Sequence, residues 1–287
     1  MTLPGYTGAK IGRGGRLALR LPPLCCITQR NAGRRSHPSA VHEAVHIDMK
    51  IIAEIGVNHD GDVARALALV ESCKRLGADY AKFQVFDSSK LVTKDAKRAA
   101  YQAEALGEGT QQDMLRKLEL GNDDFRRIHA HCEKIGIAFL ATPFDLDAAR
   151  FLIDDLGCGT VKVGSGDLDN LPLLLTIASR GVDMIVSTGM SDYDEVTLSV
   201  GAIAYGRMMH ARGEKFGLES RFPGTEDMRQ ALAAGAPSGL TLLHCTSEYP
   251  ATHPTLNMRA IAAMREKFAP VPIGFSDHST DDVAAIM

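Results

Sequence analysis

The sequence predicts an α/β fold and, within that class, a (β/α)8 TIM barrel. Short apolar runs alternate with helical stretches from residue 50 onward, which is typical of parallel βαβ units. Nearly every apolar run ends in polar residues, as in a barrel whose functional groups lie at the carboxyl ends of its strands. The rival architecture, a doubly wound sheet, would show a Gly-rich phosphate loop after its first strand. The segment at 56–61 reads GVNHDG and lacks that spacing.

Seven strands are expected, and each is a short apolar run that ends at polar or glycine residues. Near-continuous apolar strands favour a sheet that is covered by helices on one face and closed on the other. In chain order the expected strands are residues 51–57, 80–86, 137–143, 160–164, 184–188, 240–245 and 271–275. The clearest helical stretches between them are residues 62–76, 122–134, 145–156 and 257–268.

An eighth strand does not follow from this pattern. Residues 49–287 number 239, counted as 287 minus 48, against roughly 250 in a typical barrel, and they include a long insertion at about 206–239. An open barrel of seven strands would expose a sheet edge and half of its core. We therefore expect the polypeptide to be truncated before strand eight, inside the seventh helix. A closed barrel formed by these 287 residues would contradict this expectation.

Residues 1–48 differ in composition from the rest of the chain. They carry seven basic residues against Glu43 and Asp48, which gives a net charge of +5, so residues 49–287 carry −8 of the total of −3. The segment is rich in Gly and Pro and has no apolar period, which predicts a disordered basic extension before the barrel domain at 49–287. An organelle transit peptide is one alternative. A true start at Met49 is another, and we favour a dispensable tail or a misassigned start over targeting.

The composition excludes several classes of function. A net charge of −3 and a pI near 6.4 argue against a nucleic-acid-binding protein. The sequence has no apolar run of about 18 residues and therefore predicts no membrane span. Six cysteines without a Cys-x-x-Cys pair are too sparse for a disulfide scaffold or a zinc ribbon. We expect a protein of the reducing cytoplasm.

Two lysines lie inside apolar strands and give the strongest indication of function. Lys82 and Lys162 each stand near the polar end of a strand, where a charge is unfavourable unless it meets a partner. In one interpretation each lysine reaches the rim or pairs with a carboxylate. In the other, which we favour, the two ammonium groups hold a doubly anionic ligand. A Schiff base between a strand lysine and a carbonyl substrate, as in class I aldolases, is a third interpretation.

Hydroxyl side chains at the ends of the same strands would add neutral donors for such a ligand. They are Thr142, Ser165, Ser187 and Ser276. The glycines on both sides of Ser165 let backbone N–H groups approach an oxyanion, and loops at this end of a barrel commonly bind phosphate. The sequence thus predicts a phosphorylated or carboxylated small molecule. His278, taken by itself, is more often a hydrogen-bonded core residue than a metal ligand.

Seven strand-end segments, taken together and in order, resemble the sialic acid (nonulosonic acid) synthase family, of the N-acetylneuraminate and N,N'-diacetyllegionaminate synthase type. The segments are AEIGVNHDG at 53–61, KFQ at 82–84, ATPF at 141–144, KVGSG at 162–166, STGM at 187–190, HCTSEYP at 244–250 and GFSDHS at 274–279. One such motif is weak evidence, whereas seven in one order are highly specific. The resemblance covers nearly all of residues 50–287.

The resemblance implies a transferase that condenses phosphoenolpyruvate with a 2-acetamido hexose related to N-acetylmannosamine. The product is a nine-carbon 2-keto sugar acid, and phosphate leaves by C–O cleavage. A divalent metal, Mn²⁺ or Mg²⁺, polarises the open-chain aldehyde in that family. The resemblance also implies a cytoplasmic homodimer. Two lysines fit this chemistry because phosphoenolpyruvate carries both a phosphate and a carboxylate.

The family's roles can be assigned residue by residue where the motifs match. The resemblance implies phosphoenolpyruvate contacts at Lys82, Thr142, Lys162, Ser165, Ser187 and Ser276. It implies sugar contacts at Glu54, Gln84 and Tyr249, and it makes Glu54, Lys162 and His278 the candidate catalytic residues, with Glu54 handling a proton. His278 corresponds to one of two histidine metal ligands. Ser247 stands where several members carry Asn beside the phosphate, and its shorter side chain lacks the amide.

Two features of the family are absent from this sequence. The second metal-binding histidine is expected on strand eight, and a C-terminal antifreeze-like domain supplies an arginine to the partner's sugar site in the dimer. We therefore expect the 287-residue chain to be inactive or nearly so. The stretches at 94–102, 117–120 and 245–250 favour the diacetyllegionaminic branch over the N-acetylneuraminic one. The alternatives are a Schiff-base aldolase or lyase that uses Lys162, and a truncated paralogue that only binds ligand.

Overall fold

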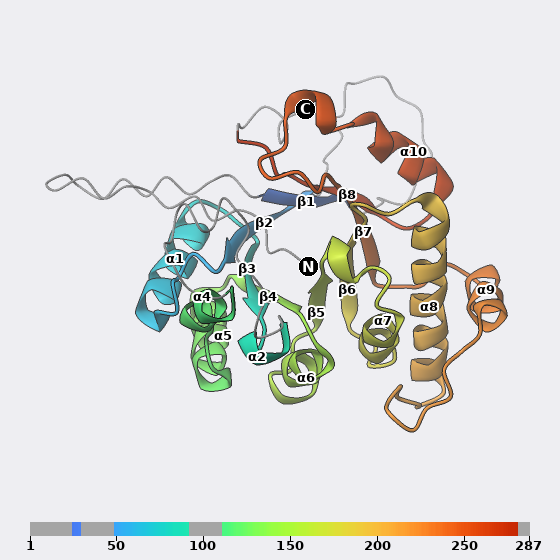
Figure 1. Ribbon diagram of the computed structural model, residues 1–287, viewed down its shortest axis with the longest axis horizontal. Helices are drawn as coiled ribbons and strands as arrows, with labels where there is room; N and C mark the ends of the chain where they lie inside the picture. The colour runs from blue at the N-terminus through green and yellow to red at the C-terminus, as the bar shows by residue number, and fades with distance from the viewer. Residues whose placement is uncertain (1–24, 30–48, 92–110, 281–287) are drawn as a thin grey trace, which may run out of the picture.

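The computed structural model describes residues 25–29, 49–91 and 111–280, with only the backbone described at 25–29 (Figure 1). Its strands, in chain order, are β1 (Cys25–Gln29), β2 (Met49–Gly56), β3 (Tyr80–Val85), β4 (Ala138–Pro143), β5 (Thr160–Val163), β6 (Asp183–Ser187), β7 (Leu240–Cys245) and β8 (Ile273–Ser276). The seven strands expected from the sequence correspond to β2 through β8. Most of their boundaries differ from the expected ones by one or two residues.

The helices lie around the outside of the strands (Figure 1). They are α1 (Val63–Arg75), α2 (Ser88–Leu91), α4 (Gln111–Leu118), α5 (Asn122–Ile135), α6 (Leu146–Arg150), α7 (Leu171–Ala178), α8 (Tyr193–Ala211), α9 (Thr225–Ala233) and α10 (Arg259–Lys267). The stretch expected as one helix at 145–156 is α6 followed by a π-helical turn at Phe151–Asp155. The insertion expected at 206–239 holds the end of α8 and all of α9. Within the described ranges, no helix is long and apolar enough to cross a membrane.

Helix α1 shows how local sequence sets these elements. The Asp62 side chain accepts hydrogen bonds from the backbone N–H groups of Ala64 and Arg65 and so caps the first turn. The buried residues of the helix recur at three- and four-residue intervals on the face that meets the sheet. They are Ala66, Leu69, Val70 and Cys73. Lys74 and Arg75 occupy the last turn, where positive charge is favourable.

The strands form one sheet in the order β4-β3-β2-β1-β8-β7-β6-β5. Strands β2, β3 and β4 pair in parallel, and so do β5, β6, β7 and β8. The two end strands of this order, β4 and β5, also lie in contact. The sheet therefore curls round in a barrel-like arrangement with the helices outside, and the predicted α/β class with parallel strands is confirmed.

Strand β1 departs from the prediction. It lies between β2 and β8 and pairs antiparallel with both, in the position that an eighth parallel strand would take in a regular barrel. It also falls within residues 1–48, for which we predict disorder, so that prediction is wrong for these five residues. Pairing on both sides explains the strand, because β2 and β8 would otherwise present open edges. The rest of 1–48 lies outside the described residues, and the truncation before strand eight stays a prediction.

Alternation along the strands divides the side chains between two environments. In β3, Ala81, Phe83 and Val85 pack against α1 and α5 in the layer between sheet and helices, while Lys82 and Gln84 face the other way. A second apolar cluster fills the same layer against α7, α8 and α10. The inner face of the sheet carries a smaller apolar cluster of Ile52, Leu140, Ile185 and Leu243, with Tyr80 packed against it. The inward residues beyond this cluster, toward the carboxyl ends of the strands, are polar.

Candidate active site

The polar inward-facing side chains stand two residues beyond the small apolar cluster on each strand. Glu54 follows Ile52, Thr142 follows Leu140, and Ser187 follows Ile185. Successive inward positions are two residues apart because side chains alternate between the faces of a strand. The apolar cluster therefore forms a floor, and the polar groups gather above it at the carboxyl ends of the strands. This is the end at which barrel enzymes place their active sites.

Lys162 is buried at this end and is tied to its neighbours by two short hydrogen bonds. Its Nζ donates to Ser187 Oγ and to the carbonyl oxygen of Val163, both at 2.6 Å. These two acceptors are neutral oxygens. The ammonium group is therefore held in place at the top of β5, where an anion bound beside it could accept a further hydrogen bond.

Lys82 forms an ion pair with Glu54 on the adjacent strand. The two residues are in register between β2 and β3, Lys82 Nζ meets Glu54 Oε2, and the side chains are 9% and 12% exposed. The pairing agrees with the first interpretation of this lysine, in which it meets a carboxylate, without excluding a bound anion. Within the described residues Glu54 Oε1 is buried and accepts no hydrogen bond. One carboxylate oxygen is thus committed to Lys82 and the other is available to a ligand.

Gly56 makes room for the residues predicted to contact the sugar. Its φ of +54° is in the region that favours glycine. A Cβ at this position would lie 2.9 Å from Glu54 Oε1 and 3.6 Å from Gln84 Nε2. The ends of Glu54 and Gln84 therefore both lie close to the glycine. Thr142 is buried beside Gln84, because the two residues are in register on β3 and β4.

Ser165 and Ser247 meet at Gly189, which comes from the loop after β6. The Gly189 N–H donates to Ser165 Oγ at 3.2 Å, and Cys245 Sγ lies 3.0 Å from the same oxygen. A Cβ on Gly189 would stand 2.8 Å from Cys245 Sγ, 2.8 Å from Ser247 Oγ and 2.9 Å from Ser165 Oγ. A side chain at position 189 would therefore collide with these three residues, whereas glycine leaves room for them. The structure brings together two hydroxyls, a thiol and a backbone N–H at one point.

His278 has both ring nitrogens engaged. Nδ1 contacts the carbonyl oxygen of Thr246, which makes Nδ1 the protonated nitrogen. Nε2 lies 3.0 Å from Tyr249 Oη and 3.2 Å from Ser276 Oγ, and the Tyr249 ring stacks on the imidazole with centroids 4.1 Å apart. Burial, together with the nearby charges of Lys162 and Lys82, lowers the pKa of His278 to about 4. The imidazole is therefore neutral at pH 7.

The donor set for the implied divalent metal is incomplete among the described residues. His278 presents the orientation of a metal ligand, with Nδ1 held by a carbonyl and Nε2 directed into the site. Within the described ranges, however, no three His, Cys, Asp or Glu side chains gather at one point. A single imidazole does not hold Mn²⁺ or Mg²⁺. These residues by themselves do not fit a metal site.

All the residues that the sequence analysis selected lie at the carboxyl ends of the strands or in the loops that follow them. The structure places three groups of them in contact: Lys162 with Ser187, Glu54 with Lys82, and His278 with Ser276 and Tyr249.

Cys245 and Gly189 were not selected as site residues. Cys245 is buried at the end of β7. Thr241, Leu243 and Cys245 alternate along β7 and so share one face of the sheet. This alternation is the signal from which the position of Cys245 at the site could have been predicted.

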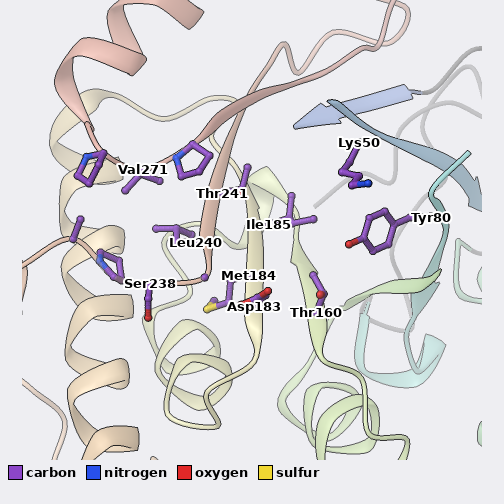
Figure 2. A pocket seen from close by; sticks show the side chains of 15 residues that line it. Lys50, Tyr80, Thr160, Asp183, Met184, Ile185, Ser238, Leu240, Thr241 and Val271 are labelled. Atoms are coloured by element: carbon purple, nitrogen blue, oxygen red, sulfur yellow. The ribbon is translucent and has the colours of Figure 1, made fainter. Parts of the chain in front are cut away.

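A separate cavity of about 510 Å³ lies at the opposite end of the strands. Figure 2 shows Lys50 and Tyr80 on one side of it and Leu240, Thr241 and Val271 on the other. Tyr80 and Thr160 line this cavity and stand two residues before Lys82 and Lys162. The cavity therefore lies on the other side of the apolar floor from the predicted site residues, and it contains none of them.

Comparison with known protein families and sequences gives consistent matches. The family model described as NeuB family matches residues 69–287. An N,N'-diacetyllegionaminic acid synthase of Legionella pneumophila is 36% identical over 232 residues, covering 80% of this chain and 57% of the relative. The synthase of the same name from Campylobacter jejuni is 35% identical and covers 80% and 60%. Human N-acetylneuraminate-9-phosphate synthase is 31% identical and covers 80% and 55%. The chain thus spans slightly more than half the length of these relatives.

Solved structures agree on the fold. A crystal structure of an N-acetylneuraminic acid synthetase from Leptospira borgpetersenii, in complex with citrate, superposes with a TM-score of 0.62 at 24% identity, covering 89% of this chain and 72% of that one. The Bacillus subtilis spore coat polysaccharide biosynthesis protein spsE gives a TM-score of 0.59 at 25% identity, with 84% and 57% covered. Similarity at this level of identity supports a shared fold.

Proposed function

The chain belongs to the NeuB family, and from that membership we propose that the protein condenses phosphoenolpyruvate with a 2-acetamido hexose of the N-acetylmannosamine type. The product would be a nine-carbon 2-keto sugar acid of the sialic and legionaminic group, with phosphate as the second product. The diacetyllegionaminic branch is the narrower proposal. Two relatives of that name are 35–36% identical, against 31% for the human N-acetylneuraminate-9-phosphate synthase. Of the stretches that favour this branch, 94–102 lies outside the described residues.

The observation that carries this proposal is the pair of buried lysines above one apolar floor. Phosphoenolpyruvate has a phosphate and a carboxylate, and Lys82 and Lys162 offer one ammonium group for each. Both lysines stand near enough to His278 for their charges to lower its pKa. The hydroxyls of Ser165, Ser187 and Ser276 are at the same end. Ammonium groups and hydroxyls supply only donors or neutral partners to an anion, which suits a ligand with several acceptor oxygens.

The proposed reaction assigns steps to the residues of this chain. The methylene carbon of phosphoenolpyruvate forms a bond to the aldehyde carbon of the open-chain sugar, and the aldehyde oxygen takes up a proton. Water adds to the cationic carbon that results, and its proton passes to a base. Loss of phosphate by C–O cleavage, with the hydroxyl proton passing to the departing phosphate, then leaves the 2-keto acid. Glu54 is the candidate for proton handling, because Oε1 accepts no hydrogen bond from the described residues while Lys82 holds Oε2.

Further parts of the proposal rest on the family resemblance. They are a homodimer, a cytoplasmic location and a requirement for Mn²⁺ or Mg²⁺. A divalent metal would supply polarisation of the aldehyde oxygen, and His278 would be one of its ligands. Because the described residues give this one ligand, no step of the reaction is assigned to a metal here.

Binding of phosphoenolpyruvate is the first test, since all the residues predicted to contact it lie within the described part of the chain. We expect calorimetric titration to show binding to the 287-residue chain. Lys162→Ala should weaken it at least about thirtyfold, equivalent to about 2 kcal/mol, because a buried charge contact to the anion is lost. Lys90→Ala is the matched control, since Lys90 is an exposed lysine paired with Asp147. Equal affinity in Lys162→Ala and Lys90→Ala would contradict the proposed site.

A second candidate chemistry follows from the burial of Lys162 on a strand. A desolvated lysine can form a Schiff base with a carbonyl compound. Treatment with pyruvate and borohydride distinguishes this from the condensation, because the proposed reaction forms no imine. A stable pyruvate adduct on Lys162, detected by mass spectrometry of peptides, would favour the aldolase or lyase. We expect no adduct.

A further inference from the structure

Ser165 Oγ accepts one defined hydrogen bond and has a second polar neighbour. The Gly189 N–H donates to it at 3.2 Å, and Cys245 Sγ lies 3.0 Å away. A serine oxygen has two lone pairs and one proton. When the thiol S–H also donates to this oxygen, both lone pairs are occupied. The Ser165 O–H is then directed away from Gly189 and Cys245 and can donate a hydrogen bond to a third group.

We propose that Cys245 is a positioning residue that orients the Ser165 hydroxyl toward the bound phosphate or carboxylate group. This inference rests on the proposed function and deepens it by adding a residue to the anion site. With Gly189 and Cys245 as donors, Ser165 is left as a donor to the ligand and is polarised by the two bonds it accepts. The thiol needs no direct contact with the ligand in this role.

The surroundings hold the thiol in this position. Cys245 is buried and is the last residue of β7, where it is in register with Ser276 of β8. Its side chain therefore starts from a paired strand, which fixes direction better than a loop does. Gly189 has no Cβ, and one placed there would come within 2.8 Å of both Cys245 Sγ and Ser247 Oγ. The missing Cβ therefore leaves the space into which these two side chains and Ser165 Oγ project.

A double-mutant cycle tests the proposal, with phosphoenolpyruvate as the probe and calorimetry as the measurement. Cys245→Ala should raise the Kd about fivefold, which is the size expected for one lost hydrogen bond. Ser165→Ala should raise it about tenfold. Since Cys245 acts through Ser165, the double variant should bind no more than about twofold more weakly than Ser165→Ala. Independent, multiplied effects in the double variant would overturn the proposal.

Two further variants separate positioning from loss of structure. Cys245→Ser keeps a donor at the same place and should bind within about twofold of the original chain. Cys158→Ala removes another buried thiol, packed under the helices and away from the site, and should leave the Kd unchanged. Equal weakening in Cys245→Ala and Cys158→Ala would show a general packing effect and refute the proposal. If the unmodified chain does not bind phosphoenolpyruvate, the proposed function fails and this role for Cys245 fails with it.

Discussion

The two buried lysines of the site have different partners and so different consequences for a ligand. Lys82 meets the carboxylate of Glu54, whereas the short contacts of Lys162 are with the neutral oxygens of Ser187 and Val163. A hydroxyl and a carbonyl are weaker partners for an ammonium group than an anion is. A phosphate or carboxylate bound beside Lys162 would add a charged acceptor to these two neutral ones. At Lys82 the same group must share the ammonium with Glu54.

His59 is a buried histidine outside the set of predicted ligands, and it makes stability depend on pH. Burial lowers the pKa of His59 to about 4, and Nδ1 accepts a hydrogen bond from the Gly61 N–H, so the ring is neutral when the protein is folded. The unfolded chain has the ordinary value near 6.5 and binds a proton first as pH falls. The stability from a neutral His59 is thus present above about pH 6.5 and is lost progressively toward pH 4.

Replacing His59 tests this dependence. His59→Gln should be less stable than the original chain at pH 7, and the difference should narrow by up to about 1.4 kcal/mol for each pH unit below about 6.5. Urea unfolding at pH 8, 7, 6 and 5 measures it, and the values at pH 8 and 7 serve as the plateau. A difference that stays constant from pH 7 to pH 5 would contradict a lowered pKa.

At the level of the elements, the start of α8 fixes the loop that carries Gly189. The Asp192 side chain accepts hydrogen bonds from the N–H groups of Asp194 and Glu195, and the Glu195 carboxylate accepts one from the Asp192 N–H. This is a capping box, which satisfies backbone donors that the first turn leaves open. The cap comes three residues after Gly189, so it also ends the loop that supplies a backbone donor to Ser165.

Loss of this cap should be measurable in the unfolding free energy. Asp192→Ala should destabilise the protein by about 1 kcal/mol, while Asp192→Ser should restore most of that loss because serine also caps. Chemical denaturation of both variants gives the comparison. An Asp192→Ser variant as unstable as Asp192→Ala would show that the stabilisation has another source.

At the scale of the whole molecule, the apolar floor separates two ends with different character. Ile52, Leu140, Ile185 and Leu243 come from four strands and meet in the interior of the sheet. Above them lie the buried charges, and below them lies the cavity that Lys50 and Tyr80 line (Figure 2). An apolar layer under charged groups limits their access to water and strengthens their electrostatic interactions.

Shortening a side chain of the apolar floor should lower the unfolding free energy of the protein. Leu243→Ala removes a fully buried side chain two residues before Cys245 and should lower the unfolding free energy by about 2–5 kcal/mol. Leu218→Ala is the matched control, since Leu218 is 88% exposed, and it should change stability by no more than about 0.5 kcal/mol. Denaturant unfolding of both variants is the measurement. Equal stability of the two would contradict the role of the floor.

The sequence by itself determined the strands β2 to β8 and the end of the sheet at which the chemistry lies. Both follow from local pattern, because apolar runs mark buried strands and side chains alternate along them. It also determined the family, through seven short motifs in one order. Which residues touch was not accessible in this way. Cys245 and Ser165 are 80 residues apart, and His278 and Thr246 are 32 apart.

Only the tertiary structure decided how these distant strand ends meet. Curling of the sheet sets which strands are neighbours, and no local period encodes that choice. The same holds for β1, which pairs with β2 and β8 although nothing in the pattern of residues 1–48 predicts a strand. Its pairing depends on two edges that exist only after the rest of the sheet has formed. Side-chain alternation and short motifs are local properties of the sequence. Which residues become neighbours across the sheet depends on how the whole sheet curls.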